Sequence, residues 1–209
     1  MNHELRNIIS RIGKITARNL IQTSLFFIRE SKSTSGTVEK PELINKKDET
    51  DKLALFATQN QLWYQGFDES TYIGEGAEQK VYLEKDGKNV IKINDGVFYA
   101  SWKDYFVGLL IHNYLFPTMV YELLGFYQKD ETFHAVVKQP FIESTEPTDL
   151  EKLRRFLENN GFQHKKNNDY FNLELGIVLE DLHDENVLTN QGVFFFIDSA
   201  IYLMNKNMY

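Results

Sequence analysis

The order of short β-rich segments between Gly66 and Phe141 restricts the fold of this chain more than any other feature of its sequence. Five segments rich in β-branched and aromatic residues surround one long helical segment, and turn residues such as Asp86 and Gly87 separate neighbouring strands. The predicted strands are 70–73, 80–84, 89–93, 121–128 and 132–141, and the predicted helix is 97–115. Because strands joined by tight turns pair as antiparallel neighbours, we expect an α+β lobe with a five-stranded antiparallel sheet and one helix.

Helical segments precede this lobe, and a smaller half follows it. Apolar residues recur at helical spacing between Glu4 and Arg29, which predicts a helical N-terminal segment over residues 1–30. A polar stretch over residues 31–52 is typical of a linker, and Asp51 is a suitable cap for a helix that ends near Gly66. We therefore predict one main domain over residues 53–209, with a first lobe at about 67–141 and a reduced second lobe at about 142–209.

The second lobe is predicted to begin with a helix and to continue with short strands. Asp149 precedes the helical pattern and Gly161 follows it, which matches the usual preferences at the two helix ends. Short strand-like runs follow at 178–179, 187–188 and 193–197, and the polar run 165–169 is predicted to be a solvated hairpin turn.

Charge and composition exclude several classes of protein. The formal net charge of −7 argues against broad nucleic-acid binding, which needs a basic surface. The chain has no cysteine, which excludes disulfides and thiolate metal sites and favours a reducing compartment, so we expect a cytoplasmic protein. We find no secretory signal and no apolar run of the roughly 20 residues that a transmembrane helix needs, so we expect no membrane partner.

A glycine-rich segment, Gly74 to Val81, lies between the first two predicted strands. Glycines allow a backbone to approach phosphate oxygens without a Cβ clash, and a hairpin over a nucleotide offers its amides to them. The segment is a weak indicator by itself. Gln79 takes the place of the third glycine of the G-x-G-x-x-G-x-V pattern, and glycine-rich hairpins without a ligand are at least as common.

Lys92 lies in the third predicted strand, within the sequence Val-Ile-Lys-Ile. Its position after the glycine-rich hairpin is the one from which a lysine ammonium reaches nucleotide phosphates. A solvent-facing strand lysine is the alternative, and that interpretation would be favoured for this tetrapeptide in isolation.

The most specific pattern lies near the C-terminus. Asp181 is followed five residues later by Asn186, and an apolar strand ends at Asp198 twelve residues after that. This spacing lets the first carboxylate face an acceptor hydroxyl while the amide and the second carboxylate bind a metal. A simple Asp and Asn turn and a core strand that ends at a cap are the alternatives. His183 lies between carboxylates, but no second histidine stands at ligand spacing, so we predict no transition-metal site there.

Taken together, the glycine loop, the strand lysine, the D-x-x-x-x-N loop and the strand-terminal Asp resemble the protein-kinase-like superfamily in order and separation. The resemblance covers about residues 71–202. The Asp-Leu-His-x-x-Asn sequence is also similar to the loop of aminoglycoside and choline phosphotransferases. The short second half is similar to the kinase-like domains of polyvalent proteins from phages and conjugative elements of bacteria.

The resemblance implies ATP and Mg²⁺ as cofactors and assigns a role to individual residues. It implies Lys92 on the α- and β-phosphates, Asp181 as catalytic base, and Asn186 and Asp198 as magnesium ligands. It also implies that adenine lies against residues 138–142. The remaining implied nucleotide contacts are Gly74, Gly76, Val81, Gln139 and Phe141.

Several positions depart from the family pattern. Leu179 and Glu180 replace the His and Arg that brace the catalytic loop in protein kinases, and residues 199–200 are Ser-Ala where Phe-Gly is usual. No clear glutamate follows Lys92, so we expect Asp104 or Glu122 to serve as its ion partner. Eleven residues follow Asp198, which we expect to leave no room for an activation segment.

Two functions therefore remain open. The first is an ATP- and magnesium-dependent phosphotransferase that acts on an unidentified hydroxyl acceptor. The second is a catalytically inactive, pseudokinase-like nucleotide-binding or interaction module of a mobile element, which the replaced bracing residues favour. In either case we expect the substrate surface to involve the N-terminal helices, a second copy of the chain or another protein.

Overall fold

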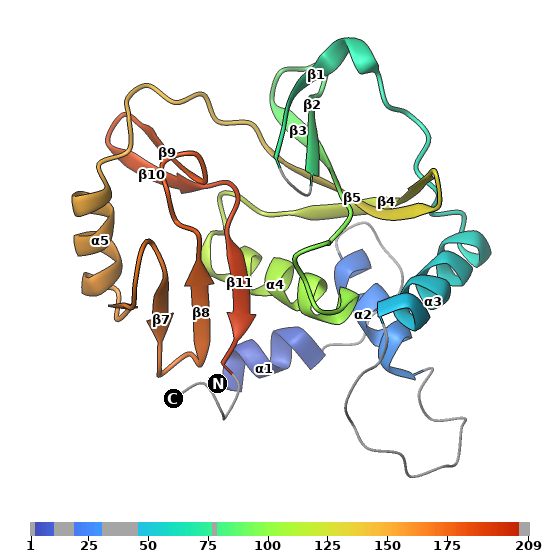
Figure 1. Cartoon of the computed structure of the whole chain (residues 1–209), viewed down its shortest axis with the longest axis horizontal. Coiled ribbons are helices and arrows are strands. Elements are labelled where there is room, and N and C mark those ends of the chain that lie inside the picture. Colours follow the sequence, from blue (N-terminus) through green and yellow to red (C-terminus); the bar gives the residue numbers. More distant parts are fainter. Residues whose placement is uncertain (1–2, 11–18, 31–45, 77–78, 205–209) are drawn as a thin grey trace. The chain divides into compact units, whose positions relative to one another are not determined.

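The computed structural model describes residues 3–10, 19–30, 46–76 and 79–204, and the chain divides into two compact units (Figure 1). Unit 1 comprises residues 1–9, 108–120 and 140–209, and unit 2 comprises residues 10–107 and 121–139. The division passes through helix α4 (Trp102–Leu115). Residues 11–18 of the predicted N-terminal helical segment and residues 31–45 of the predicted linker lie outside the described residues.

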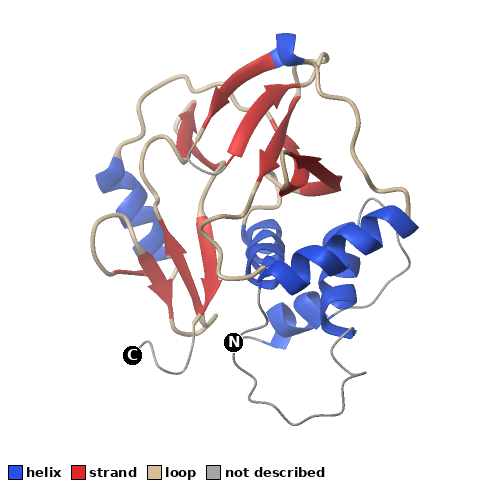
Figure 2. Ribbon diagram, turned by 45° about the vertical axis from the view of Figure 1, so that its right-hand side comes forward, coloured by secondary structure: helices blue, strands red, loops and turns tan. Residues whose placement is uncertain are grey.

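Unit 2 contains the five-stranded antiparallel sheet that the sequence predicts. The strand order is β1-β2-β3-β5-β4, so the last two strands enter as a hairpin with β5 next to β3. The strands, shown in red in Figure 2, are β1 (Tyr72–Glu75), β2 (Gln79–Leu83), β3 (Asn89–Asn94), β4 (Glu122–Lys129) and β5 (Thr132–Pro140). A short 3-10 helix, η2 (Glu69–Thr71), precedes β1 and occupies the start of the first predicted strand.

The two faces of this sheet carry different sets of side chains. One face holds a buried cluster, and Tyr64 and Phe67 from the segment before β1 pack against it. The members of the cluster are Tyr82, Ile91, Ile93 and Val136. The opposite face packs on α4, where the rings of Trp102 and Phe133 meet edge to face at 5.3 Å between centroids. Because successive side chains of a strand point to opposite faces, neighbouring residues of each strand pack against different parts of unit 2.

Helix α3 (Lys46–Gln59) begins before Asp51, the residue near which the sequence predicts its start. Its first turn contacts the segment between β3 and α4. Lys46 donates to the carbonyl oxygens of Gly96 and Tyr99, and Glu49 accepts a hydrogen bond of 3.2 Å from the backbone N–H of Lys103. These contacts explain why part of the predicted linker is helical, since tertiary partners stabilise a polar first turn.

Helix α2 (Leu20–Glu30) contributes buried leucines and isoleucines to the same unit and packs on α3 and β4. A close backbone approach lies nearby at Gly125 of β4, whose φ is +152°. A Cβ at this position would lie 2.2 Å from the carbonyl oxygen of Leu62, and the backbone of Phe126 bonds with both Leu62 and Tyr64. Only glycine allows the 62–64 segment to lie this close to β4.

The C-terminal part of unit 1 contains helix α5 and two small antiparallel sheets. Helix α5 (Leu150–Asn159) begins as predicted, because the Asp149 carboxylate accepts hydrogen bonds from the backbone N–H groups of Glu151 and Lys152. The first sheet pairs β9 (Val187–Asn190) with β10 (Val193–Phe196). Of the three phenylalanines of β10, Phe196 is buried and stacks on Phe116 at 4.0 Å between ring centroids, whereas the other two are half-buried.

The second sheet of unit 1 has the order β11-β8-β7-β6, and three of its strands lie side by side in Figure 1. Its strands are β6 (Gln163–His164), β7 (Tyr170–Asn172), β8 (Ile177–Glu180) and β11 (Ala200–Leu203). The sequence predicts β8 only, because the other three are short and their residues show no extended alternation. Residues 165–169 form the turn between β6 and β7, which confirms the predicted hairpin turn.

Helix α1 (His3–Ser10) opens the chain, and its Glu4 carboxylate accepts a hydrogen bond of 3.1 Å from the Tyr114 hydroxyl within unit 1. His112 is buried and its Nε2 lies 2.9 Å from the carbonyl oxygen of Met119, as expected for a structural histidine. Over the described part of the chain, every helix is too short or too polar to cross a membrane.

Candidate nucleotide and metal site

Lys92 of unit 2 is a buried lysine. Only 4 % of its surface is exposed, and its Nζ lies 5.5 Å from the centroid of the Tyr121 ring. A lysine that merely solubilised a strand would keep its ammonium in water. The structure therefore rejects the solvent-facing interpretation of this side chain.

Two other predicted nucleotide contacts share a sheet face with Lys92. Val81 lies directly opposite Lys92 in the β2–β3 pair, and residues directly opposite one another project to the same face. Gln139, which is 1 % exposed, lies three positions after Val136 in β5, and Val136 belongs to the cluster on the other face. The alternation of β5 consequently puts Gln139 on the Lys92 face.

The glycines of the β1–β2 hairpin have no packing reason to be glycine. A Cβ at Gly74 would meet no atom within 4 Å, and one at Gly76 would meet only the Gln79 side chain, at 3.9 Å. The hairpin is closed by a hydrogen bond of 2.9 Å from the Gly76 N–H to the Gln79 carbonyl oxygen. Ala77 and Glu78, at the tip, lie outside the described residues. Open space above a glycine backbone is what an approaching phosphate requires.

The two carboxylates expected to pair with Lys92 make other contacts. Asp104 forms a capping arrangement with Ser101 at the start of α4, with a hydrogen bond of 2.7 Å from the Ser101 hydroxyl. Glu122 forms an ion pair with Lys138 at 3.1 Å, which raises the pKa of Lys138. α4 begins at Trp102, later than the predicted residue 97, so Asp104 lies in the first turn of the helix. In this position Asp104 caps the helix and does not pair with Lys92.

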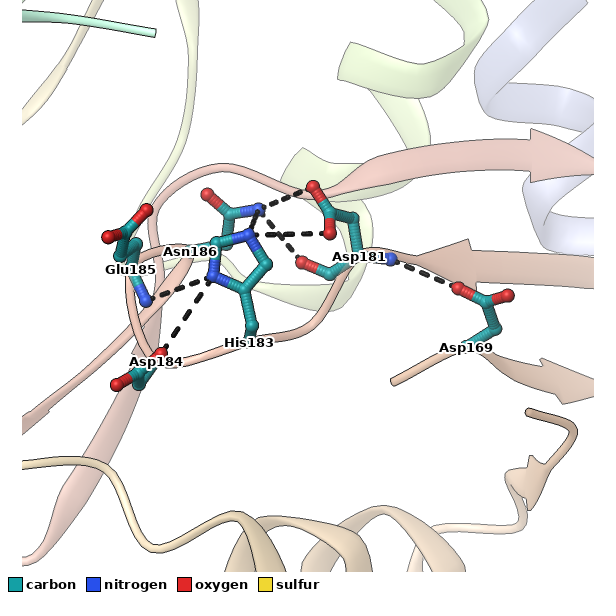
Figure 3. A network of polar contacts seen from close by, with 6 residues as sticks. All are labelled: Asp169, Asp181, His183, Asp184, Glu185 and Asn186. Atoms are coloured by element: carbon teal, nitrogen blue, oxygen red, sulfur yellow. Dashed lines mark hydrogen bonds and ion pairs between the residues drawn. The ribbon is translucent and has the colours of Figure 1, made fainter. Parts of the chain in front are cut away.

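In unit 1, Asp181 begins the loop between β8 and β9 in a left-handed conformation, with φ of +64°. The side-chain amide of Asn186 donates to the Asp181 carbonyl oxygen at 2.8 Å and to its carboxylate at 3.1 Å (Figure 3). The amide nitrogen faces Asp181, so the amide oxygen points away from that carboxylate. The D-x-x-x-x-N pattern thus closes into a compact ring, with the exposed carboxylate of Asp181 at its rim.

His183 lies inside this ring. Its Nδ1 accepts a hydrogen bond of 3.2 Å from the Glu185 N–H. Its Nε2 lies 3.1 Å from the side-chain amide nitrogen of Asn186 and 3.3 Å from a carboxylate oxygen of Asp181 (Figure 3). His183 thus contacts the residues at both ends of the D-x-x-x-x-N pattern.

The two predicted metal ligands are adjacent along the same ring. The backbone N–H groups of Ile197 and Asp198 both donate to the carbonyl oxygen of Asn186, at 2.9 and 3.2 Å. β11 follows at once and pairs with β8, with Ala200 opposite Glu180. Strand pairing on both sides therefore fixes Asp198 beside Asn186.

This donor set fits magnesium. Mg²⁺ is usually held by one or two protein oxygens together with phosphate oxygens and water, and a carboxylate with an amide oxygen suffices. The described residues include no group of three or more His, Asp or Glu side chains arranged to hold a metal ion. A site built from Asn186 and Asp198 would accordingly depend on the phosphates of a nucleotide.

The remaining predicted contact, Phe141, belongs to unit 1 and is 37 % exposed just after β5. Unit 2 itself has cavities of about 390 and 330 Å³, both bordered by Tyr82. They open on the sheet face opposite Lys92, and Gly76 is the one predicted contact among the residues that line them.

The family model for the Serine/Threonine/Tyrosine Kinase found in polyvalent proteins matches residues 46–205. The chain belongs to this family. The match begins at the first residue of α3 and contains every residue of the predicted site, which confirms the kinase-like resemblance and the α+β fold class. A comparison with curated proteins found no match.

Within this kinase-like domain, the structure brings Asp181, Asn186 and Asp198 together in unit 1 and places Val81, Lys92 and Gln139 on one sheet face in unit 2. Sequence reasoning missed Asp169, whose carboxylate accepts a hydrogen bond of 3.3 Å from the Asp181 N–H. Its only sequence signal is its place in a polar turn, which does not indicate what the turn contacts.

Proposed function

We propose that this chain is an ATP- and magnesium-dependent phosphotransferase that acts on a hydroxyl acceptor. The hydrogen bond between the Asp198 N–H and the Asn186 carbonyl oxygen carries the proposal, because it makes neighbours of two magnesium-binding residue types that are twelve positions apart. The Asn186 amide extends the same network to Asp181. Membership of a kinase family supports this assignment.

In the proposed reaction, Asp181 accepts the proton of the acceptor hydroxyl. The acceptor oxygen then forms a bond to the γ-phosphorus, and the bond between that phosphorus and the ADP oxygen breaks. Lys92 balances charge on the α- and β-phosphates, and the glycine hairpin offers backbone N–H groups. Asn186 and Asp198 would hold magnesium, which would supply neutralisation of the phosphate charge.

The alternative is a nucleotide-binding or interaction module without catalysis. The replacement of Phe-Gly by Ser199 and Ala200, the second of which begins β11, favours it. Under either function we propose a cytoplasmic protein that a bacterial mobile element encodes. We also propose that its N-terminal helices contact a second copy of the chain or another protein.

Calorimetric titration with a non-hydrolysable ATP analogue, with and without magnesium, tests the site, and ATP turnover tests catalysis. Magnesium-dependent binding with turnover that Asp181→Asn abolishes is the expected result. Binding without turnover would establish the non-catalytic module. No binding by the wild type would refute the phosphotransferase and would leave an interaction module with a kinase-like fold.

A further inference from the structure

We propose that the β6–β7 turn is the brace of the catalytic loop, and that Asp169 is a positioning residue for Asp181. This inference rests on the proposed phosphotransferase function for its kinetic consequence, but its structural content is independent of catalysis. It starts from the backbone of Asp181, because a non-glycine residue with φ of +64° is strained and persists only where neighbours hold it.

Two consecutive residues of the turn bind two consecutive N–H groups of the loop. The Asp169 carboxylate accepts from the Asp181 N–H at 3.3 Å, and the Asn168 carbonyl oxygen accepts from the Leu182 N–H at 3.1 Å. Leu182 is fully buried, so the second bond anchors the loop to the interior of unit 1. Figure 3 shows the contact between Asp169 and Asp181.

The register between β7 and β8 places Asp169 next to the catalytic loop. β7 pairs with β8 so that Tyr170 lies opposite Leu179, which places Asp169 opposite Glu180, just before the loop. The turn itself is closed by two backbone hydrogen bonds of 2.9 Å, between Lys165 and Asp169 and between Asp169 and Lys166. Asp169 is therefore fixed on both sides before it meets the loop.

The β6–β7 turn supports the catalytic loop in place of the two residues before Asp181. Leu179 and Glu180 stand where the kinase resemblance would place His and Arg, and both are paired strand residues of β8. Leu179 is fully buried among apolar neighbours and has no polar atom in its side chain. The support for Asp181 comes instead from the neighbouring hairpin.

Asp181 is held from two directions as a result. Asp169 holds its N–H, and Asn186 holds its carbonyl oxygen and carboxylate. Removal of the Asp169 acceptor would allow the strained backbone of Asp181 to relax, and the Asp181 carboxylate would then change its orientation. The residues proposed to bind ATP would stay in place. The expected kinetic effect is a lower kcat with an unchanged KM for ATP.

The test compares Asp169→Ala and Asp169→Ser, whose side chains are too short to reach, with Asp169→Asn, which keeps an acceptor oxygen and removes the charge. Lys166→Ala, an exposed position of the same turn, is the matched control. The readouts are kcat and KM for ATP, and the hydrogen-exchange rates of the Asp181 and Leu182 amides measured by NMR on the full chain.

We expect Ala and Ser to lower kcat by about tenfold and to speed exchange of the Asp181 amide by a similar factor, since each factor of ten reflects the loss of one modest interaction. We expect Asn and the control to stay within about threefold of wild type. Unchanged exchange of the Asp181 amide in Asp169→Ala and Asp169→Ser would overturn the brace. A loss of kcat in Asp169→Asn as large as that in Asp169→Ala would also overturn it. A wild type without turnover would instead refute the proposed function, and the exchange rates would still decide the brace.

Discussion

The backbone N–H of Asp198 donates to the carbonyl oxygen of Asn186 across 3.2 Å, which joins the end of one strand to the loop that precedes its partner. The backbones of the two proposed metal ligands thereby become neighbours. This relationship leads to the first prediction.

Asp198→Ala is expected to abolish the magnesium dependence of ATP-analogue binding, because it removes the charged member of the proposed metal pair. Calorimetric titration with and without magnesium measures the effect. Asp184→Ala, an exposed carboxylate of the same loop, is the control and should bind like wild type. Equal magnesium dependence in wild type and Asp198→Ala would exclude Asp198 as a ligand.

Asp181→Asn is expected to reduce kcat by on the order of 10²- to 10⁴-fold, the usual contribution of a positioned general base. ATP-analogue affinity should stay close to wild type, since Asp181 is proposed to contact the acceptor. Steady-state turnover and titration together measure the two quantities. The control is Glu185→Gln, which changes an exposed carboxylate four residues away. A variant as active as wild type would mean that Asp181 is not the base.

Lys92→Met is expected to weaken ATP binding by about tenfold or more, because a charge-assisted contact to phosphate is lost while the buried volume is nearly kept. Lys88→Met is the matched control, since it exchanges an exposed lysine in the turn before the same strand. Thermal melts of both variants check the fold. If the two variants bound the nucleotide equally well, Lys92 would have a structural role alone.

Gly125→Ala is expected to destabilise unit 2 by about 2 kcal/mol or more, the range found when extra atoms are forced into a packed backbone contact. The new Cβ would lie 2.2 Å from the Leu62 carbonyl oxygen, and the φ of +152° is unfavourable for alanine. Denaturant unfolding measures the loss. At Gly66 a Cβ would meet only the Tyr64 ring at 3.8 Å, so Gly66→Ala is the control that should unfold close to wild type.

Glu49→Gln is expected to stabilise the protein increasingly as pH rises. Burial raises the pKa of the Glu49 carboxyl above its ordinary value of 4.5, so the folded state resists ionisation. Wild type therefore loses stability relative to the variant as pH rises from about 4.5 through the raised native pKa, and the difference then levels off.

Melting temperatures of wild type and Glu49→Gln across pH 4 to 8 measure this difference. Asp48→Asn, exposed on the same helix, is the control and should show no such trend. A difference that shrinks with rising pH would contradict the sign of the effect.

The positions of β2, β3, β4 and β5 followed closely from periodicity, because each of these strands is long enough to alternate. β1 and α4 begin later than predicted. α3 begins earlier, since its first turn is polar and owes its helical start to contacts of Lys46 and Glu49 with residues about fifty positions away. In unit 1, β8 was predicted from its apolar residues, whereas β6, β7 and β11 have at most four residues each and gave no periodic signal.

The order of the chemical motifs, the strand that carries Lys92, the strand that precedes Asp198 and the caps of α5 were predictable from the sequence, because they depend on residue type and local spacing. The burial of Lys92, the place of Asn186 beside Asp198 and the contact of Asp169 with Asp181 became visible in the folded chain alone. The reason is that these relationships depend on strand register and on hydrogen bonds between polar residues distant in sequence. Such bonds select partners by position in space, and polar residue types alone do not reveal which partner each will find.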